Sequence, residues 1–420
     1  MNSQKGHEKF IWAASGALNA TVIICLLGGF YHPWLIVLWI ISWLVIFLPG
    51  ERIKISTSSF FSKNMGLMLL ATILPLLVRF FLINPDRLHG DEFVIAANSV
   101  DFDWARDNFF TSLPTRWPWP GGQTPAIMYV LQKIFLKIFG EDFLGIKLSG
   151  LPYVFLTSVF LYLLAKNLFG RIAAFLTLWA YSFLAIILYF DLLGGEHHLL
   201  GPMMTLTALL WALERFYHHP SRRWAMLAGV ITGWNYFYYY TSFMALPLAV
   251  LFIIAFNKIQ NSSWHKTLKN YFISFFLVFS PTLAQMIGER RLTLFLPRWD
   301  KIGLFNGEYS PLAVQSSWVE KLIFPFKSLA IFLMSFFKKG LGGSSGFDFE
   351  HQAMLGPFTG LLFIMGLGIL IYWIYQKRYP RLLLLLLFGA WLLEFPGVVL
   401  TIPVASYHRF VAVLPLMALM

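Results

Sequence analysis

An adjacent pair of acids, Asp91-Glu92, stands a few residues after the apolar stretch 65–83. Adjacent carboxylates repel each other, so one of them can keep a raised pKa. A carboxylate of that kind suits a general base that removes a proton from an acceptor hydroxyl. The alternative is that the pair consists of solvated loop acids, or caps the helix expected over the following residues. Spacing alone favours this second interpretation.

A second polar group, residues 191–198, follows a later apolar stretch and contains Asp191, Glu196, His197 and His198. Glutamate and histidine together could bind a divalent cation, because carboxylate and imidazole suit zinc or manganese. The two histidines cannot point the same way on one helix, so the pair alone is a poor chelate. Hydrogen bonding to a substrate and a simple helix start are the other two interpretations of this turn.

Two basic groups could bind an anion such as a phosphate. His408 and Arg409 precede the final apolar segment, where they could contact a phosphate or simply extend to the membrane surface. A basic run after the apolar stretch 271–287 could anchor the chain at the interface or capture a phosphate. Its members are Arg290, Arg291, Arg298 and Lys301.

The composition shows what kind of fold must position these residues. Of 420 residues, 58% are hydrophobic and only 12% are charged. A soluble chain could not bury so much apolar surface, and one cysteine, Cys25, allows no intrachain disulfide. We therefore predict an all-α polytopic membrane protein with about 11–12 transmembrane helices of about 20 residues each. No nucleotide-binding or HExxH motif is present.

The basic residues predict how the chain crosses the membrane. If the N-terminus is cytoplasmic, each short loop that faces the cytoplasm is basic, as the positive-inside rule requires. The net charge of +12 then reflects these loops and does not indicate a nucleic-acid partner. On this map, residues 1–64 form an N-terminal helical hairpin and 65–420 a transmembrane catalytic domain.

The same map places two long loops, 84–147 and 288–355, outside the cytoplasm. The first should carry an amphipathic helix over about 125–139, and the second an interfacial helix over 318–337. After Arg409 only residues 410–420 remain, too few to cross a bilayer. We expect either a half-span there or the front part of a longer architecture.

Several short motifs, in this order, resemble the GT-C superfamily of integral-membrane glycosyltransferases. The closest branch is that of the protein O-mannosyltransferases and lipid A aminoarabinose transferases, and the resemblance covers about residues 65–420. The motifs are His89-Gly90-Asp91-Glu92, Gly121–Pro125 with Ile138-Phe139-Gly140, Leu163–Arg171, Gly229–Ser242, Gly356-Pro357 and Tyr407–Phe410 with Leu414-Pro415.

This resemblance implies a reaction, its partners and a role for each candidate residue. Such enzymes move a hexosyl or pentosyl group from a polyprenyl-phosphate carrier to an acceptor hydroxyl on the outer face of the membrane. The acceptor would be a protein, a lipid or a glycan, and a prokaryotic plasma membrane is the expected location. Asp91 would be the general base and Glu92 its support. Asp191, Glu196 and His197 would form a second acidic site, and Arg298, His408 and Arg409 would bind the donor phosphate.

Two other classes remain open at the level of sequence. A transporter or flippase of lipid-linked sugars would place its charges on interrupted helices near the bilayer midplane. An O-antigen ligase or polymerase would also act on lipid-linked glycans. The pattern requires no cofactor, and a divalent cation at the 191–198 turn remains an open alternative. This turn lacks the arginine of the corresponding turn in many relatives, which argues against a donor-phosphate role for it.

Overall fold

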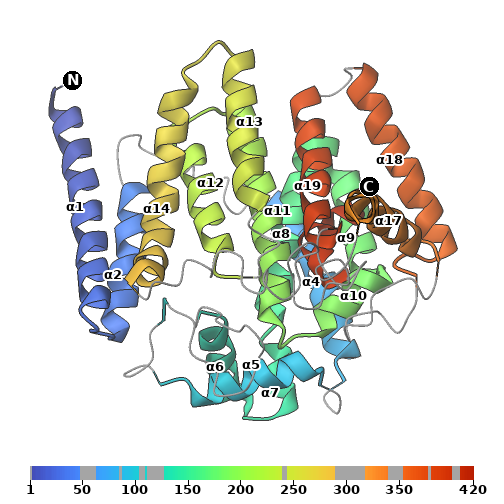
Figure 1. Ribbon diagram of the computed structural model, residues 1–420, viewed down its shortest axis with the longest axis horizontal. Helices are drawn as coiled ribbons and strands as arrows, with labels where there is room; N and C mark the ends of the chain where they lie inside the picture. The colour runs from blue at the N-terminus through green and yellow to red at the C-terminus, as the bar shows by residue number, and fades with distance from the viewer. Residues whose placement is uncertain are drawn as a thin grey trace.

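The computed structural model describes residues 2–47, 63–84, 88–103, 109–110, 127–238, 244–288, 317–338, 353–376, 380–399 and 407–420. Every regular element in these ranges is a helix, which confirms the all-α fold class. Most helices run side by side in one bundle, and α5, α6 and α7 lie across its lower end (Figure 1).

The helices of the first half of the chain build one side of the bundle and the layer across its end. They are α1 (Asn2–Leu27), α2 (Pro33–Leu44), η1 (Val45–Phe47), α4 (Lys63–Leu82), α5 (Gly90–Asp101), α6 (Ile127–Phe139), α7 (Phe143–Leu148), α8 (Leu151–Phe169), α9 (Arg171–Phe183) and α10 (Ala185–Leu192).

The helices of the second half complete the bundle. They are α11 (His197–His218), α12 (Arg222–Asn235), α13 (Ala245–Ile259), α14 (Trp264–Gly288), α17 (Trp318–Ser335), α18 (Pro357–Gln376), α19 (Arg381–Val399), η5 (Tyr407–Val413) and α20 (Leu414–Met417). The first of them, α11, is buried along most of its length and passes through the centre of the core.

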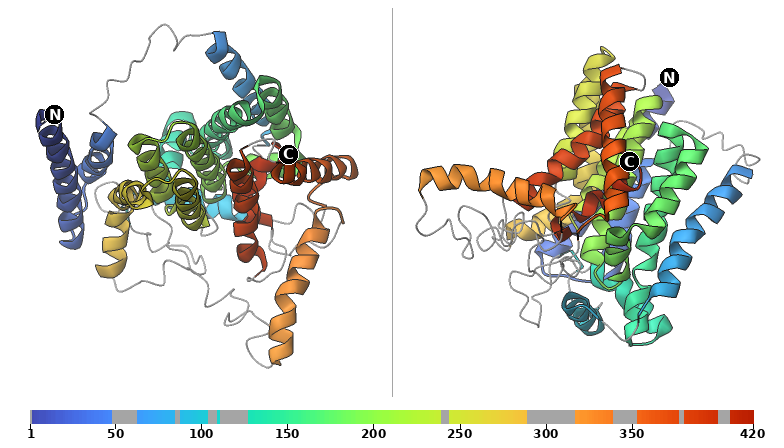
Figure 2. Two further views of the ribbon diagram at one scale, coloured as in Figure 1. Left: turned by 90° about the horizontal axis from the view of Figure 1, so that it is seen from above. Right: turned by 90° about the vertical axis from the view of Figure 1, so that its right-hand side faces the viewer.

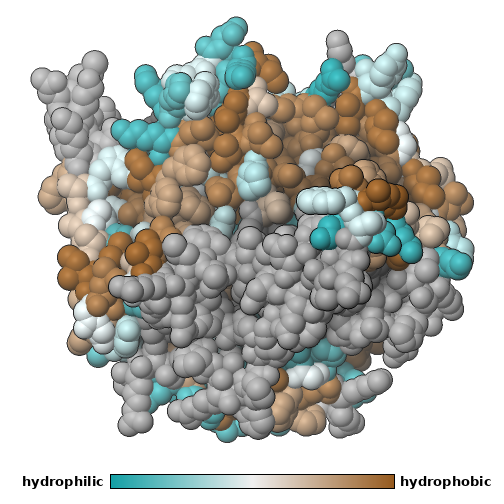
Figure 3. Space-filling view, viewed as in Figure 1, coloured by the Kyte–Doolittle hydropathy of each residue, from teal (hydrophilic) through white to brown (hydrophobic). Residues whose placement is uncertain are grey.

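The surface of the bundle is apolar where a membrane would surround it. Hydrophobic side chains form a broad band below a hydrophilic upper edge (Figure 3). Among the described residues, the helical stretches 10–27, 143–169 and 357–376 are long and apolar enough to cross a bilayer. The pair α9 and α10, bent by 63°, forms a further candidate. The chain is an integral membrane protein, and the total of 11–12 spans remains a prediction.

The arrangement in space agrees with the charge pattern. The N-terminus, the α13–α14 turn, the C-terminal end of α18 and the N-terminal end of α19 lie at the upper end of the bundle, opposite the layer of α5, α6 and α7 (Figure 1). Helix α17 points away from the bundle, nearly at right angles to it (Figure 2), and exposes Trp318, Leu322 and Phe326. Such a helix has the shape expected at a membrane surface.

The N-terminal hairpin is bonded into the bundle through α14. The Trp39 indole donates to the Val278 carbonyl at 3.0 Å, and the Asn19 amide donates to the Leu277 carbonyl at 2.7 Å. Trp39 also stacks on Trp234 of α12 with ring centroids 5.4 Å apart. Both bonds use buried polar groups, which must be paired to avoid a desolvation cost.

Candidate functional site

The first acidic pair opens helix α5, and its two members differ in role. His89 is the N-cap residue, and its imidazole accepts from the Asp91 N–H at 3.3 Å. Glu92 completes a capping box, because its carboxylate accepts from the His89 N–H at 2.8 Å. Both acids thus stand in the first turn of a helix, where the helix dipole favours negative charge.

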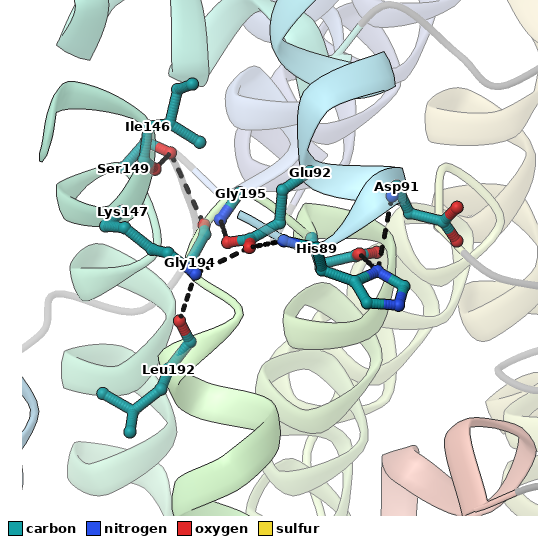
Figure 4. A network of polar contacts seen from close by, with 10 residues as sticks. His89, Asp91, Glu92, Ile146, Lys147, Ser149, Leu192, Gly194 and Gly195 are labelled. Atoms are coloured by element: carbon teal, nitrogen blue, oxygen red, sulfur yellow. Dashed lines mark hydrogen bonds and ion pairs between the residues drawn. The ribbon is translucent and has the colours of Figure 1, made fainter. Parts of the chain in front are cut away.

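Glu92 is fully buried and accepts from donors on three segments (Figure 4). Besides the His89 N–H, these are the Lys147 ammonium at 2.6 Å and the Gly195 N–H at 3.0 Å. Lys147 also donates to the Leu192 carbonyl at 3.0 Å. Glu92 and Lys147 therefore tie α5 and α7 to the 191–198 turn, and we call them the Glu92–Lys147 lock.

Two glycines let this turn approach α7 so closely. A Cβ atom on Gly194 would lie 2.1 Å from the Lys147 carbonyl oxygen, and one on Gly195 would lie 2.6 Å from Ile146 Cγ2. Real Cβ atoms do not approach so closely, so any larger residue would push the turn off α7. The Gly-Gly dipeptide before Glu196 is therefore required by packing.

Three acceptor groups from two distant segments meet beside the lock. One nitrogen or oxygen each of His89, Asp91 and Glu196 lie within 4.8 Å of one another. Glu196 is fully buried, whereas His89 and Asp91 are half-buried. We call these three residues the open cluster, because its buried carboxylate, Glu196, meets imidazole groups and bonds to no lysine or arginine among the described residues.

A proton must lie between His89 and Glu196. Nδ1 of His89 is 2.7 Å from Oε1 of Glu196, and two bare acceptors would repel at this distance. The pKa of Glu196 is raised well above its ordinary value, first by burial and then by the negative charges of Asp91 and Glu92. The raised pKa favours a carboxylic acid at Glu196 that donates to the His89 lone pair.

The donor set of the open cluster also fits a divalent cation. It offers one imidazole nitrogen and two carboxylates, a combination that suits zinc or manganese. Oε2 of Glu196 is buried and accepts no hydrogen bond from the residues that the structure describes, although Nδ1 of His198 lies 3.3 Å away. A cation could replace the shared proton and use this free oxygen.

His197, in the same turn, lies outside the open cluster and contacts α7 and α8. Nε2 of His197 is 2.7 Å from the Ser149 hydroxyl, which itself donates to the Ile146 carbonyl at 2.5 Å. The serine oxygen therefore accepts, and His197 carries its proton on Nε2. Its ring also packs on Tyr153, with centroids 5.0 Å apart. Through Ser149 and Tyr153, His197 contributes to the packing of α8 against α11.

Asp191 does not join the open cluster. Its Oδ2 accepts from two nitrogens of Arg79, Nε at 2.9 Å and Nη2 at 2.6 Å. Arg79 is fully buried and also donates to the carbonyls of Tyr181 and Ser182, where α9 ends before its 63° bend. We call Arg79 and Asp191 the Arg79–Asp191 lock.

The sequence did not point to the two cations of these locks. Arg79 was detectable in principle, since an ionisable residue within an apolar span indicates a partner or a function. Lys147 carries no such signal, because it stands near the end of a polar loop. The phosphate-binding candidates stay predictions: Arg298 lies outside the described residues, and so do the side chains of His408 and Arg409, whose backbone lies in η5.

Comparison with known proteins supports the resemblance seen in the sequence. Residues 123–284 match the family model described as dolichyl-phosphate-mannose-protein mannosyltransferase. This match covers less than half of the chain. No curated protein sequence matches significantly.

The fold is similar to that of an archaeal oligosaccharyltransferase, AglB from Archaeoglobus fulgidus. The structure of AglB with an inhibitory peptide and a dolichol-phosphate shares 13% identity and a TM-score of 0.52, covering 84% of this chain and 49% of AglB. The apo crystal structure of the A. fulgidus oligosaccharyltransferase gives 14% and 0.51, with 86% and 50% coverage. This chain thus spans about half the length of these proteins. The resemblance to the GT-C superfamily is confirmed by the family model and by the fold.

Proposed function

We propose that the chain is a glycosyltransferase that moves a sugar from a polyprenyl-phosphate carrier to an acceptor hydroxyl outside the cytoplasm of a prokaryote. The observation that carries the proposal is the open cluster, where Asp91 and Glu196 meet at the end of a membrane bundle. The family model and the GT-C fold support lipid-linked sugar transfer. The dolichol-phosphate bound to AglB supports a lipid carrier, and its inhibitory peptide supports a protein acceptor.

In this proposal Asp91 is the general base. As the acceptor oxygen bonds to the anomeric carbon, the acceptor proton passes to the Asp91 carboxylate. The bond between that carbon and the phosphate oxygen breaks, and the electron pair leaves with the polyprenyl phosphate. The configuration at the anomeric carbon is inverted, because the acceptor attacks opposite the leaving phosphate.

The other residues prepare Asp91 for this step. The Glu92–Lys147 lock fixes the first turn of α5 and holds the 191–198 turn against it. Glu196 and His89 share a proton beside Asp91, and we assign this pair to acceptor positioning, while His197 holds the turn through Ser149. A divalent cation bound by the open cluster would supply positive charge for the leaving phosphate. Arg298, His408 and Arg409 are our candidates for donor-phosphate contacts.

One observation favours transport as a second candidate function. Helices α9 and α10 are bent by 63° beside a buried ion pair, and interrupted helices with charged residues are typical of transporters. In a transporter, however, the carbonyls freed by such a break line the substrate site. Here Arg79 takes the freed carbonyls of Tyr181 and Ser182, so the break serves packing.

Purified protein in vesicles separates the two functions. Polyprenyl phosphates carrying different radiolabelled sugars are supplied with peptide, lipid or glycan acceptors, and free polyprenyl phosphate is measured. Transfer predicts acceptor-dependent release, and Asp91→Asn should lower it by about 10²–10⁴-fold, the usual contribution of a general base. Glu141→Gln, an exposed acid of the same loop, is the matched control. Movement of intact carrier across the bilayer without release would contradict the proposal.

A chelation arm tests the cation. If the open cluster holds a divalent cation, EDTA should abolish release and added manganese or zinc should restore it. Unchanged release in EDTA would remove the cation and leave Asp91 as a metal-independent base.

A further inference from the structure

A groove of about 540 Å³ runs between α1 and α14, away from the layer that carries the open cluster. Its walls are apolar, with Phe272 and Phe276 on α14 facing Gly16 and Ala20 on α1, and Lys269 lies at one end. The α1 side belongs to the candidate membrane span Phe10–Leu27. The groove therefore opens at the depth of the hydrocarbon region.

The groove owes its depth to the small residues of α1. A Cβ atom placed on Gly16 would meet no atom within 4 Å, and Ala20 follows one helical turn later on the same face. Between them on α1, the Asn19 amide donates to the Leu277 carbonyl at 2.7 Å, and the Ser280 hydroxyl donates to Asn19 at 2.7 Å. These bonds fix the two helices, so the groove between them is part of the folded structure.

The same bonds set the register and bring basic residues to one end of the groove. Both helices run in the same direction from the upper end of the bundle (Figure 1), rising about 1.5 Å per residue. Lys9 precedes Asn19 on α1 by about as many residues as Lys266 and Lys269 precede Leu277 on α14. The backbone of Lys9 thus lies at the level of the two α14 lysines.

The positive charge at this end is not neutralised by the described residues. Lys266 and Lys269 are exposed, and neither forms a hydrogen bond or an ion pair with any residue that the structure describes. No acid occurs between 258 and 270, and Glu8 is the one acid in the first 28 residues. An anion at this end would meet two ammonium groups.

We propose that this groove binds an anionic glycerophospholipid, with one acyl chain between α1 and α14 and the phosphate at Lys269 and Lys266. The apolar walls match hydrocarbon, and the lysines match the charge of the headgroup. The lysine end lies opposite the layer of α5, α6 and α7 (Figure 1), so a phosphate held there cannot reach the open cluster. The ligand is therefore a structural lipid, and the inference does not depend on the proposed reaction.

Native mass spectrometry tests this site on the purified full chain. The protein is delipidated and then offered equal amounts of phosphatidylglycerol and phosphatidylcholine of different mass. Wild-type protein should retain phosphatidylglycerol preferentially. Lys269→Gln should reduce that preference about fivefold, the usual effect of one lysine at an anionic membrane surface. Gly16→Phe should abolish retention by filling the groove.

Matched controls keep the test specific. Lys258→Gln removes an exposed lysine from the same end of the bundle, and Gly368→Phe adds the same ring at another open position of a membrane helix. Neither should change retention. Equal retention of both lipids by wild type, or unchanged preference in both Lys269→Gln and Gly16→Phe, would overturn the site. Displacement of phosphatidylglycerol by equimolar polyprenyl phosphate would also overturn it, by assigning the groove to a carrier lipid.

Discussion

Asp191 and Glu196 are five residues apart in one turn and both are buried, yet their surroundings differ. Asp191 is paired with the fully buried guanidinium of Arg79 through two nitrogens. Glu196 meets imidazole groups and the carboxylate of Asp91, and no lysine or arginine bonds to it among the described residues. The neighbours Glu92 and Asp91 also differ, because Glu92 is fully buried and bonded to Lys147, whereas Asp91 is half-buried and borders Glu196.

This contrast separates carboxylates that hold the fold from carboxylates that can do chemistry. The Glu92 carboxylate already accepts from the Lys147 ammonium and two backbone N–H groups, and the Asp191 charge is compensated by the Arg79 guanidinium, so both acids are committed to the fold. Glu196, which bonds to no lysine or arginine among the described residues, keeps its proton or acquires a ligand. We therefore expect changes in Glu92 and Asp191 to affect stability first, and changes in Asp91 and Glu196 to affect transfer first.

The largest effect on stability should come from breaking the Glu92–Lys147 lock. Lys147→Met leaves the Glu92 carboxylate buried without its cation, which typically costs about 3–5 kcal/mol. The thermal midpoint of the purified protein should fall sharply, while Lys137→Met, an exposed lysine on α6, should leave it unchanged. Equal midpoints for the two variants would show that Lys147 is not a structural cation.

Breaking the Arg79–Asp191 lock should also lower stability, but an apolar pair should be able to replace it. Arg79→Met leaves the Asp191 carboxylate buried without its cation and should lower the free energy of unfolding by about 3–5 kcal/mol. The double variant Arg79→Met/Asp191→Leu removes both charges and should restore most of the loss in thermal midpoint, because well-packed apolar residues often replace a buried ion pair without loss of stability. A double variant no more stable than the single one would indicate that Arg79 acts mainly by holding the carbonyls of Tyr181 and Ser182.

A smaller loss is expected from the glycine turn. Gly195→Ala places a Cβ atom 2.6 Å from Ile146 Cγ2 and 3.1 Å from Glu92 Cβ, and overpacking of this kind usually costs about 1–3 kcal/mol. Because the turn carries Glu196, transfer should fall as well. Gly66→Ala, which meets open space, provides the control. Wild-type transfer in Gly195→Ala would show that the turn need not touch α5.

The smallest effect is the pH dependence that Glu196 contributes. The pKa of Glu196 is raised in the folded protein by burial and nearby negative charge. Its protonated form therefore contributes its full stabilisation at pH values below the pKa that Glu196 has in the unfolded chain. That stability is lost as pH rises toward the folded pKa. Midpoints measured in EDTA should therefore fall with rising pH more in wild type than in Glu196→Gln. Parallel curves would mean that folding does not raise the pKa of Glu196.

Much of the fold could be predicted from the sequence, because it depends on local patterns. The apolar content predicted the all-helical membrane fold. The polar-to-apolar spacing predicted an amphipathic helix over about 125–139, where α6 spans Ile127–Phe139. The charge pattern placed Asp91 and Glu196 on one side, and the structure brings them together. Each of these features follows from residue periodicity or from sidedness.

The rest of the site could not be predicted, because it depends on pairing between distant segments. Lys147 meets Glu92 across 55 positions, and Arg79 meets Asp191 across 112. No local periodicity encodes which buried cation will neutralise which acid. The sequence therefore grouped Asp191 with Glu196 as one acidic site, while the structure gives Asp191 to a buried ion pair and leaves Glu196 in the open cluster.

The most direct test is a side-by-side measurement of thermal midpoint and acceptor-dependent polyprenyl phosphate release for Asp91→Asn and Glu92→Gln. The two residues are adjacent, and each substitution replaces one carboxylate oxygen by an amide nitrogen. Our account predicts that Asp91→Asn keeps the wild-type midpoint and loses release, whereas Glu92→Gln lowers the midpoint. An Asp91→Asn protein that releases polyprenyl phosphate at the wild-type rate would contradict it.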